Sequence, residues 1–173
     1  MSAALGAAAS APFGDGIPFA DPAWYQGQAS PYYGASHVAF RKRCRDFCEA
    51  VKPRAELSLE RGEQYPRELH KEAYAAGLAG AIYPKECGGT PPADYDAFHE
   101  LILWDEVTRI GVPGIFGALA INSMALPPVI KHGSHRMRRE VVEPTVRGDK
   151  FCCLAIRCVF RVQGGGWETG PCS

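Results

Sequence analysis

A chain of 173 residues is long enough for one ordinary domain with a substantial core. Hydrophobic residues make up 46% and charged residues 22%, proportions typical of soluble globular proteins. The formal net charge is zero, which excludes a strong attraction of the whole molecule to nucleic acid or to an anionic membrane.

The cysteines and the start of the chain bear on the compartment. There are seven cysteines, an odd number that a complete disulfide framework does not leave. The first thirty residues contain no Lys or Arg, so they lack the basic start of a secretory signal and the arginines of a mitochondrial presequence. We therefore expect reduced thiols in an intracellular protein, with mitochondrion, peroxisome and cytoplasm all left open.

Residues 1–35 are rich in Ala, Gly, Pro and Ser and predict a mostly disordered lead. Four aromatic side chains in this lead are expected to pack onto the domain that follows: Trp24, Tyr25, Tyr32 and Tyr33.

The first predicted helix begins at Ser36 and ends near Val51, because Pro53 follows. Its apolar residues recur with a helical period: Phe40, Cys44, Phe47, Cys48 and Val51. Cys44 and Cys48 have a spacing compatible with a metal ion. No second pair of Cys or His lies nearby in the sequence, so we interpret both as small core residues.

A second helix is predicted from about Pro66 to Gly77, with Leu69, Ala73 and Ala76 on its buried edge. The glycine-rich turn that follows, residues 77–89, lacks the Gly-Lys-Ser/Thr of a phosphate-binding loop.

A third helix is predicted to run from a cap at Asp94 to about Arg109. Residues 101–104 are apolar all round, which predicts burial on more than one side. Asp105 and Glu106 are adjacent and point apart on a helix, so we do not expect them to form a catalytic carboxylate pair.

Residues 114–132 predict a fourth helix without any charge before Lys131. The uncharged stretch 110–130 is long enough to span a bilayer, but its three prolines and Asn122 favour a helix buried on all sides of a bundle. We therefore expect no membrane span. Four residues are candidates for one face, which either packs a core or lines an apolar slot: Phe116, Ala120, Ile121 and Met124.

Ser134 is expected to cap a fifth helix that ends near Arg147. The basic cluster over residues 131–139 lacks interleaved aromatics, so it indicates a solvated helix face and no nucleic-acid partner. His132 and His135 have no further metal ligands in the sequence nearby. The apolar run Phe151–Ile156 predicts a buried strand, and residues 157–173 form a divergent tail rich in Gly and Cys.

The order of these segments resembles the N-terminal helical domain of the acyl-CoA dehydrogenase family, over roughly residues 36–156. The resemblance implies a mainly α fold: an orthogonal bundle of five to six helices over residues 36–150, ending in one orphan β-strand at 151–156. The sequence stretches that carry it are Phe47 to Pro53, Tyr65-Pro-Arg-Glu-Leu69, Pro84-Lys-Glu-Cys-Gly-Gly89, Asn122 to Ile130 with Gly133, and Gly148 to Ile156.

Members of this family are oligomeric FAD flavoproteins that remove two hydrogens across the α,β carbons of an acyl-CoA thioester. A glutamate takes the α-proton, and the flavin accepts the β-hydride. The resemblance implies that Phe116, Ala120, Ile121 and Met124 line the acyl slot. It also implies that the backbone of Leu154, Ala155 and Ile156 approaches the flavin. It assigns no catalytic residue and no metal ligand.

One departure from the family pattern shapes the expected function. Where the family continues with Thr/Ser-Glu-Pro, this chain reads Arg157-Cys158-Val159. The Thr/Ser hydroxyl that bonds the flavin in the family is therefore missing here. The family's remaining β-domain, its C-terminal helices and its catalytic glutamate also have no counterpart in these residues. We expect a truncated, inactive member that supplies one wall of the active site. The alternative is a non-catalytic helical module that pairs with full-length subunits.

Overall fold

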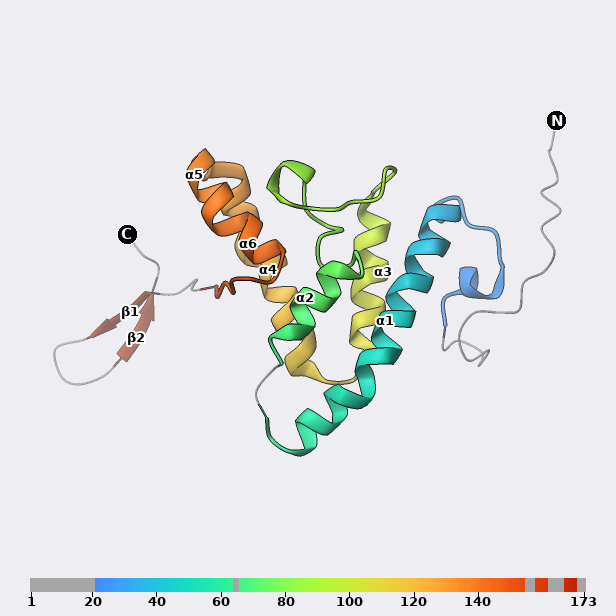
Figure 1. The fold of residues 1–173 in the computed structure, drawn as a ribbon, viewed down its shortest axis with the longest axis horizontal. Coiled ribbons are helices and arrows are strands. Elements are labelled where there is room, and N and C mark those ends of the chain that lie inside the picture. Colours follow the sequence, from blue (N-terminus) through green and yellow to red (C-terminus); the bar gives the residue numbers. More distant parts are fainter. Residues whose placement is uncertain (1–20, 64–65, 155–157, 162–166, 171–173) are drawn as a thin grey trace.

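The structure is a computed structural model that describes residues 21–63, 66–154, 158–161 and 167–170. In the two last ranges only the backbone is described. The described part of the domain is a bundle of helices, with α1 and α3 side by side and α2 and α4 packed next to them (Figure 1).

Helix α1, Ala35–Glu60, is longer than predicted because it continues through Pro53. The proline cannot donate to the carbonyl of Glu49, but both residues are exposed, so water can bond that carbonyl. Val51, Ala55 and Ser58 keep the helical period on the buried side. Burial of this stripe offsets the cost of the proline, so the prediction that Pro53 ends the helix is wrong.

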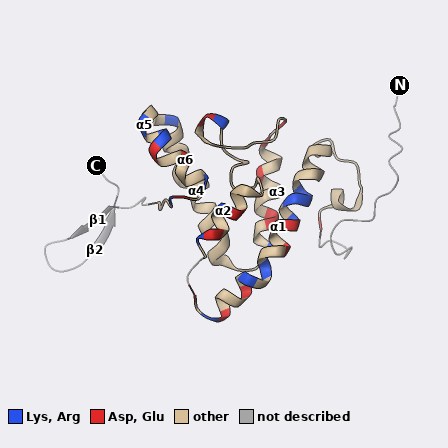
Figure 2. Cartoon of the chain, viewed as in Figure 1, with Lys and Arg blue, Asp and Glu red and all other residues tan. Residues whose placement is uncertain are grey.

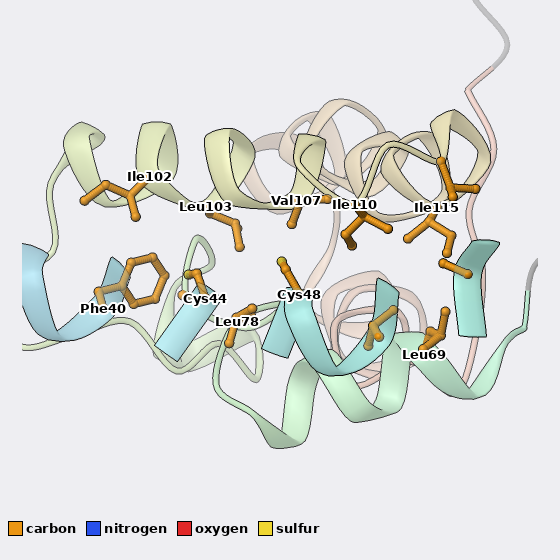
Figure 3. Packing of buried hydrophobic residues seen from close by; sticks show 14 residues of the cluster. Phe40, Cys44, Cys48, Leu69, Leu78, Ile102, Leu103, Val107, Ile110 and Ile115 are labelled. Carbon is orange, nitrogen blue, oxygen red and sulfur yellow. The ribbon is translucent and has the colours of Figure 1, made fainter. Parts of the chain in front are cut away.

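Helix α3, Ala97–Thr108, packs along α1 and forms the centre of the core. Phe40, Cys44 and Cys48 of α1 face Ile102, Leu103 and Val107 of α3 (Figure 3). The interpretation of Cys44 and Cys48 as core residues is confirmed, since their exposed fractions are 0% and 2%. Burial raises the pKa of both thiols, which keeps them protonated.

The cap of α3 is Asp96, two residues later than the predicted Asp94. The Asp96 carboxylate accepts from the backbone N–H groups of Phe98 and His99, at 3.0 and 3.3 Å. Leu101 corrects a second expectation, because it is 55% exposed while its neighbours Ile102 and Leu103 are buried. Helix α3 is therefore covered mainly on the side that faces α1.

Helix α2, Glu68–Ala75, follows Pro66 and ends before Gly77, close to the prediction. Leu69 and Ala73 are buried, and Ala76 packs partly buried against the same core. A short 3-10 turn, η2 (Lys85–Cys87), then carries Cys87 into a second cluster.

The second cluster joins the end of α4 to the last helical run. It contains Tyr83, Cys87, Leu126, Val142 and Val146. This run consists of α5 (His135–Met137), the π-helical turn η3 (Arg138–Val142) and α6 (Glu143–Val146). The predicted cap is confirmed, because Ser134 Oγ accepts from the Met137 N–H at 3.2 Å.

Pro144 interrupts the hydrogen-bond ladder of this run, since it has no N–H to donate. The Glu140 carbonyl instead accepts from Lys150 Nζ at 2.7 Å. The π-helical turn η3 directly precedes Pro144 and contains Glu140, so it lies where the regular hydrogen-bond ladder is interrupted.

Helix α4, Pro113–His132, has the predicted extent and is drawn almost entirely without charged residues (Figure 2). The prediction that it is buried on all sides is wrong. Ile115, Asn122 and Leu126 face the bundle, but Met124 is 53% exposed. By length and composition alone this helix could cross a membrane, yet one side of it packs against α3 and η3.

The lead packs on the bundle over its described part. The 3-10 turn η1 (Ala23–Gln26) buries Tyr25, and Trp24 stacks on Tyr33 with centroids 4.1 Å apart. The guanidinium of Arg41 lies 4.2 Å from the Trp24 ring and 4.4 Å from the Tyr25 ring. Packing of these aromatics is thus confirmed, although Tyr32 remains 61% exposed. The disordered lead was predicted for residues 1–35, and its first part, residues 1–20, lies outside the described residues.

The predicted strand at 151–156 is not formed over its described part. Phe151–Leu154 has no regular secondary structure, and Ala155 and Ile156 lie outside the described residues. A strand needs a partner, and no described segment pairs with this one.

The described strands lie further along the chain, where the glycine-rich sequence did not indicate them. Strand β1 (Cys158–Arg161) pairs antiparallel with β2 (Trp167–Gly170), with Cys158 opposite Gly170 and Arg161 opposite Trp167.

Gly148 lets the chain after α6 pass close to α2. Its φ of 84° is left-handed, and an added Cβ would lie 2.9 Å from the Lys71 backbone N and 3.1 Å from the His70 backbone C. Both the backbone conformation and the close approach therefore require glycine.

We expect Gly148→Ala to lower the free energy of unfolding by about 1–2 kcal/mol or more, the cost of a left-handed alanine plus the contact with α2. Urea unfolding measures this. Gly117→Ala is the matched control, because Gly117 is helical and its Cβ would meet nothing within 4 Å. The control should gain up to about 1 kcal/mol. Equal effects of the two substitutions would contradict this account of Gly148.

Candidate functional site

Glu106 on α3 is a carboxylate with no exposed surface. Arg45 of α1 donates from Nη2 to Glu106 Oε1 at 2.9 Å, and its Nε bonds Oε2. The Tyr25 hydroxyl, also buried, lies 2.9 Å from Glu106 Oε1 and 2.8 Å from Asp105 Oδ2, so these two carboxylates share its one proton. Both oxygens of Glu106 are thus held by fixed donors, so the group joins α1, α3 and the lead instead of serving as a free base.

Burial raises the pKa of Tyr25, and the two carboxylates beside it act in the same direction. Its hydroxyl therefore stays protonated and remains a donor. The sequence analysis considered Glu106 only together with the adjacent Asp105 and predicted no partner for it. The structure shows the hydrogen-bonded, fully buried arrangement, which no spacing in the sequence links to Arg45.

Three residues could by type hold a metal ion: His37, Asp96 and His99, whose ligand atoms lie within 4.8 Å of one another. Their hydrogen bonds instead suit helix capping. The Gly34 N–H donates to His37 Nδ1 at 2.9 Å, so the proton of the neutral ring sits on Nε2, 2.9 Å from Asp96 Oδ1. A metal would need that Nε2 lone pair. The His37 hydrogen bond lowers the pKa of Asp96 to about 2, which keeps the cap ionised.

An apolar pocket lies where α1, α2, α3 and α4 meet. Phe47, Leu78, Leu103 and Leu119 are among the side chains that line it. The space left inside is about that of one water molecule. Of the residues singled out in the sequence for an acyl slot, none lines this pocket.

Two buried polar side chains stand in the wall of this pocket. Asn122 Nδ2 of α4 lies 3.3 Å from His70 Nε2 of α2, and the two residues are only 2% and 3% exposed. His70 Nδ1 and Asn122 Oδ1 have no hydrogen-bond partner among the described residues. Burial lowers the pKa of His70, so the imidazole is neutral.

The sequence analysis did not single out His70. The signal for Asn122 was its position, because Ile115, Asn122 and Leu126 share one face of a helix at spacings of seven and four. A lone amide on an otherwise apolar stripe is expected to need a buried partner.

The residues predicted to line an acyl slot do not all lie on one side of α4. Phe116 packs edge-on against Trp104, with centroids 5.9 Å apart, and Ala120 is buried. Ile121 is half-buried and Met124 is exposed. Met124 lies two residues from Asn122, about 200° around the helix, so it points away from the bundle. The assignment of these four residues stays a prediction.

Of the residues predicted to approach a flavin, only Leu154 is described, and it is 36% exposed. No backbone hydrogen bond of residues 152–154 is formed with the described part of the chain. Free N–H and C=O groups are compatible with a bound ring edge, and they provide no test of one.

Comparison with known proteins identifies the family. The family model for the N-terminal domain of acyl-CoA dehydrogenases matches residues 34–149, which is most of the bundle. The chain belongs to the acyl-CoA dehydrogenase family. Its described helices correspond to the N-terminal helical domain of these enzymes, which confirms the resemblance read from the sequence.

Curated relatives agree with this assignment. The chain is 30% identical over 156 residues to acyl-CoA dehydrogenase AFT10-1 of Alternaria alternata, covering 83% of this chain and 36% of the relative. It is 29% identical over 139 residues to the mitochondrial short-chain specific acyl-CoA dehydrogenase of Mus musculus, covering 80% and 32%. The chain thus spans about a third of the length of the curated relatives it matches.

Solved structures share the fold. A protein described as an acyl-CoA dehydrogenase from Mycobacterium smegmatis superposes with a TM-score of 0.62 at 31% identity, over 79% of this chain and 34% of that one. Butyryl-CoA dehydrogenase from Megasphaera elsdenii superposes with a TM-score of 0.60 at 22% identity, over 71% and 32%. The second likeness concerns the fold alone.

Removal of the buried carboxylate should be costly. We expect Glu106→Ala to lower the free energy of unfolding by about 3–5 kcal/mol, because Arg45 and Tyr25 would lose the buried carboxylate oxygens that they bond. Urea unfolding measures the loss. The control is Glu72→Ala, which breaks an ion pair with Arg54 whose side chains are 47% and 44% exposed, and should change stability by about 1 kcal/mol or less. Similar losses for both variants would show that Glu106 is not a structural anchor.

The His70–Asn122 pair should behave as one unit. We expect His70→Phe and Asn122→Leu each to cost about 1–3 kcal/mol, since each leaves the other polar group buried without its partner. The double substitution removes both polar groups and should cost less than the sum. Thermal or urea unfolding of the four proteins checks this. Additive losses of stability would mean that the two side chains do not depend on each other.

Proposed function

We propose that this chain supplies the N-terminal helical wall of the acyl slot of an acyl-CoA dehydrogenase. The observation that carries the proposal is the two-sidedness of α4. Helix α4 has no charged residue before Lys131, yet only 22% of its most apolar stretch is buried. A helix that is apolar all round normally has apolar surroundings on every side. The outer side of α4, with Met124 at its centre, therefore fits an apolar ligand and the remainder of an enzyme.

An acyl chain suits this surface chemically. Ile121 and Met124 offer aliphatic and thioether groups without any hydrogen-bonding atom that would need a partner. Each methylene that such a surface removes from water contributes about 0.8 kcal/mol. The same apolar character gives no means of recognising a charged head group, so the CoA part would be bound by other residues.

The family's members are FAD flavoproteins, and Leu154 is the described residue among those expected to approach the flavin. When bound, FAD supplies the acceptor for the β-hydride in the family's reaction. The part of this chain that fits it is the backbone of residues 152–154, which forms no backbone hydrogen bond with the described part of the chain and could bond the ring whatever the side chains are. We assign no residue of this chain as the catalytic base.

A chimera tests the proposal directly. Residues 34–149 of this chain would replace the matching domain of the Alternaria alternata relative. We expect the chimera to hold FAD and to have the flavin bleached by an acyl-CoA. We expect Met124→Glu in the chimera to raise KM for long acyl chains at least tenfold while FAD content is unchanged. A folded, FAD-loaded chimera that responds to no acyl-CoA would contradict the proposal.

The 173-residue chain by itself provides a second test. Since it contributes only one wall, we expect the purified chain to show no stoichiometric flavin absorbance and no turnover of acyl-CoA. Tight binding to full-length subunits of a relative, with Met124 dispensable in the chimera, would favour a non-catalytic module. A stoichiometric flavin absorbance band in the purified chain would contradict the proposal that the chain supplies one wall of a larger site.

A further inference from the structure

We infer that His70 is a positioning residue that couples α4 to the segment Gly148–Leu154. The functional consequence of this coupling rests on the proposed function, in which α4 lines the acyl slot and the segment Gly148–Leu154 leads to the flavin. The link itself is a property of the described residues and does not depend on that function. The contacts on the two sides of His70 come from different parts of the chain.

On one side, His70 contacts α4. Asn122 Nδ2 lies 3.3 Å from His70 Nε2 in a fully buried position. With Asn122 as the donor, His70 Nε2 must accept, and the ring carries its proton on Nδ1. Protonation of the ring, or its replacement by a group without an acceptor, therefore breaks this contact.

On the other side, His70 contacts the segment that leaves the bundle. Its ring meets the Phe151 ring edge to face, with centroids 5.8 Å apart and an interplanar angle of 72°. The Arg67 guanidinium, one helical turn before His70, lies 5.2 Å from the same ring. Phe151 is 39% exposed, and these two contacts join its ring to α2.

The backbone of the segment is held against α2 as well. Gly148 passes so close to α2 that a Cβ would lie 2.9 Å from the Lys71 N and 3.1 Å from the His70 backbone carbon. Asp149 Oδ1 forms an ion pair with Lys71 Nζ at 2.9 Å. The chain is thus held against α2 at Gly148 and again at Phe151, three residues before Leu154. The next residue, Cys152, is held by α6, because its Sγ lies 3.6 Å from Thr145 Oγ1. A shift of the His70 ring would move the Phe151 contact, which lies shortly before the residues proposed to reach the cofactor.

Two substitutions of His70 separate its two contacts. His70→Gln keeps an amide that can bond Asn122 but removes the ring that packs on Phe151. His70→Phe keeps a ring but removes the acceptor for Asn122. If His70 only fills space in the core, neither replacement should change how the stability losses caused by substitutions at Asn122 and Phe151 combine.

The experiment is a double-mutant cycle on the 173-residue chain, with Asn122→Leu and Phe151→Leu measured in the native, His70→Gln and His70→Phe backgrounds. We expect the two substitutions to be non-additive with His70 present and additive in both His70 variants. Additivity in the native background, or non-additivity that persists in either variant, would overturn the inference. Lys71→Ala is the control and should leave the native non-additivity intact, because the Lys71–Asp149 pair is exposed.

A second measurement serves if a double variant fails to fold. Asn122→Leu alone should shift the amide NMR signal of Leu154 in the native background and leave it in place in His70→Phe. A shift of equal size in both backgrounds would also overturn the inference. Neither measurement involves FAD or acyl-CoA, so failure here leaves the chimera test untouched. Success here with an inactive chimera would retain the link and discard its functional consequence.

Discussion

The bundle depends on the contact between α1 and α3, and a buried ion pair lies in that contact. Arg45 and Glu106 are 61 residues apart in sequence and meet where the two helices pack. Around them the apolar rows of both helices face each other, as Figure 3 shows. A charge pair at this place stabilises only one alignment of the helices, because any other separates the buried Glu106 carboxylate from Arg45. Tyr25 extends the same constraint to the lead.

With α1 and α3 aligned, the remaining helices are placed by what they share with this pair. α2 and α4 close a small apolar pocket against it, and the His70–Asn122 contact joins them within that pocket. This arrangement turns one side of α4 inward and leaves the other, with Met124, outward. The side of α4 that packs in the bundle and the side proposed to face the acyl chain are therefore opposite sides of one helix. Under this proposal, a helix without charge before Lys131 can pack in a stable bundle and also offer an apolar outer side to a ligand.

Periodicity in the sequence predicted most of the helices and failed where a partner decides the outcome. The stripe from Phe40 to Val51 gave α1 but not its continuation through Pro53, which depends on packing beyond the proline. The apolar run at Phe151 read as a strand, although strand formation needs a second segment that a single run does not encode. The contacts of Glu106 and His70 join distant parts of the chain. No local pattern predicts such pairs, whereas the family resemblance followed from short motifs in a fixed order.

The central claim is that the outer side of α4 lines an acyl slot. Photo-crosslinking tests it most directly, using the FAD-loaded chimera and an acyl-CoA that carries a diazirine near the end of its alkyl chain. Peptide mass spectrometry would then locate the label. We predict labelling at Ile121 and Met124 and none at Leu119 or Asn122, which face the bundle. Labels confined to Leu119 and Asn122, or absent from α4, would contradict the account.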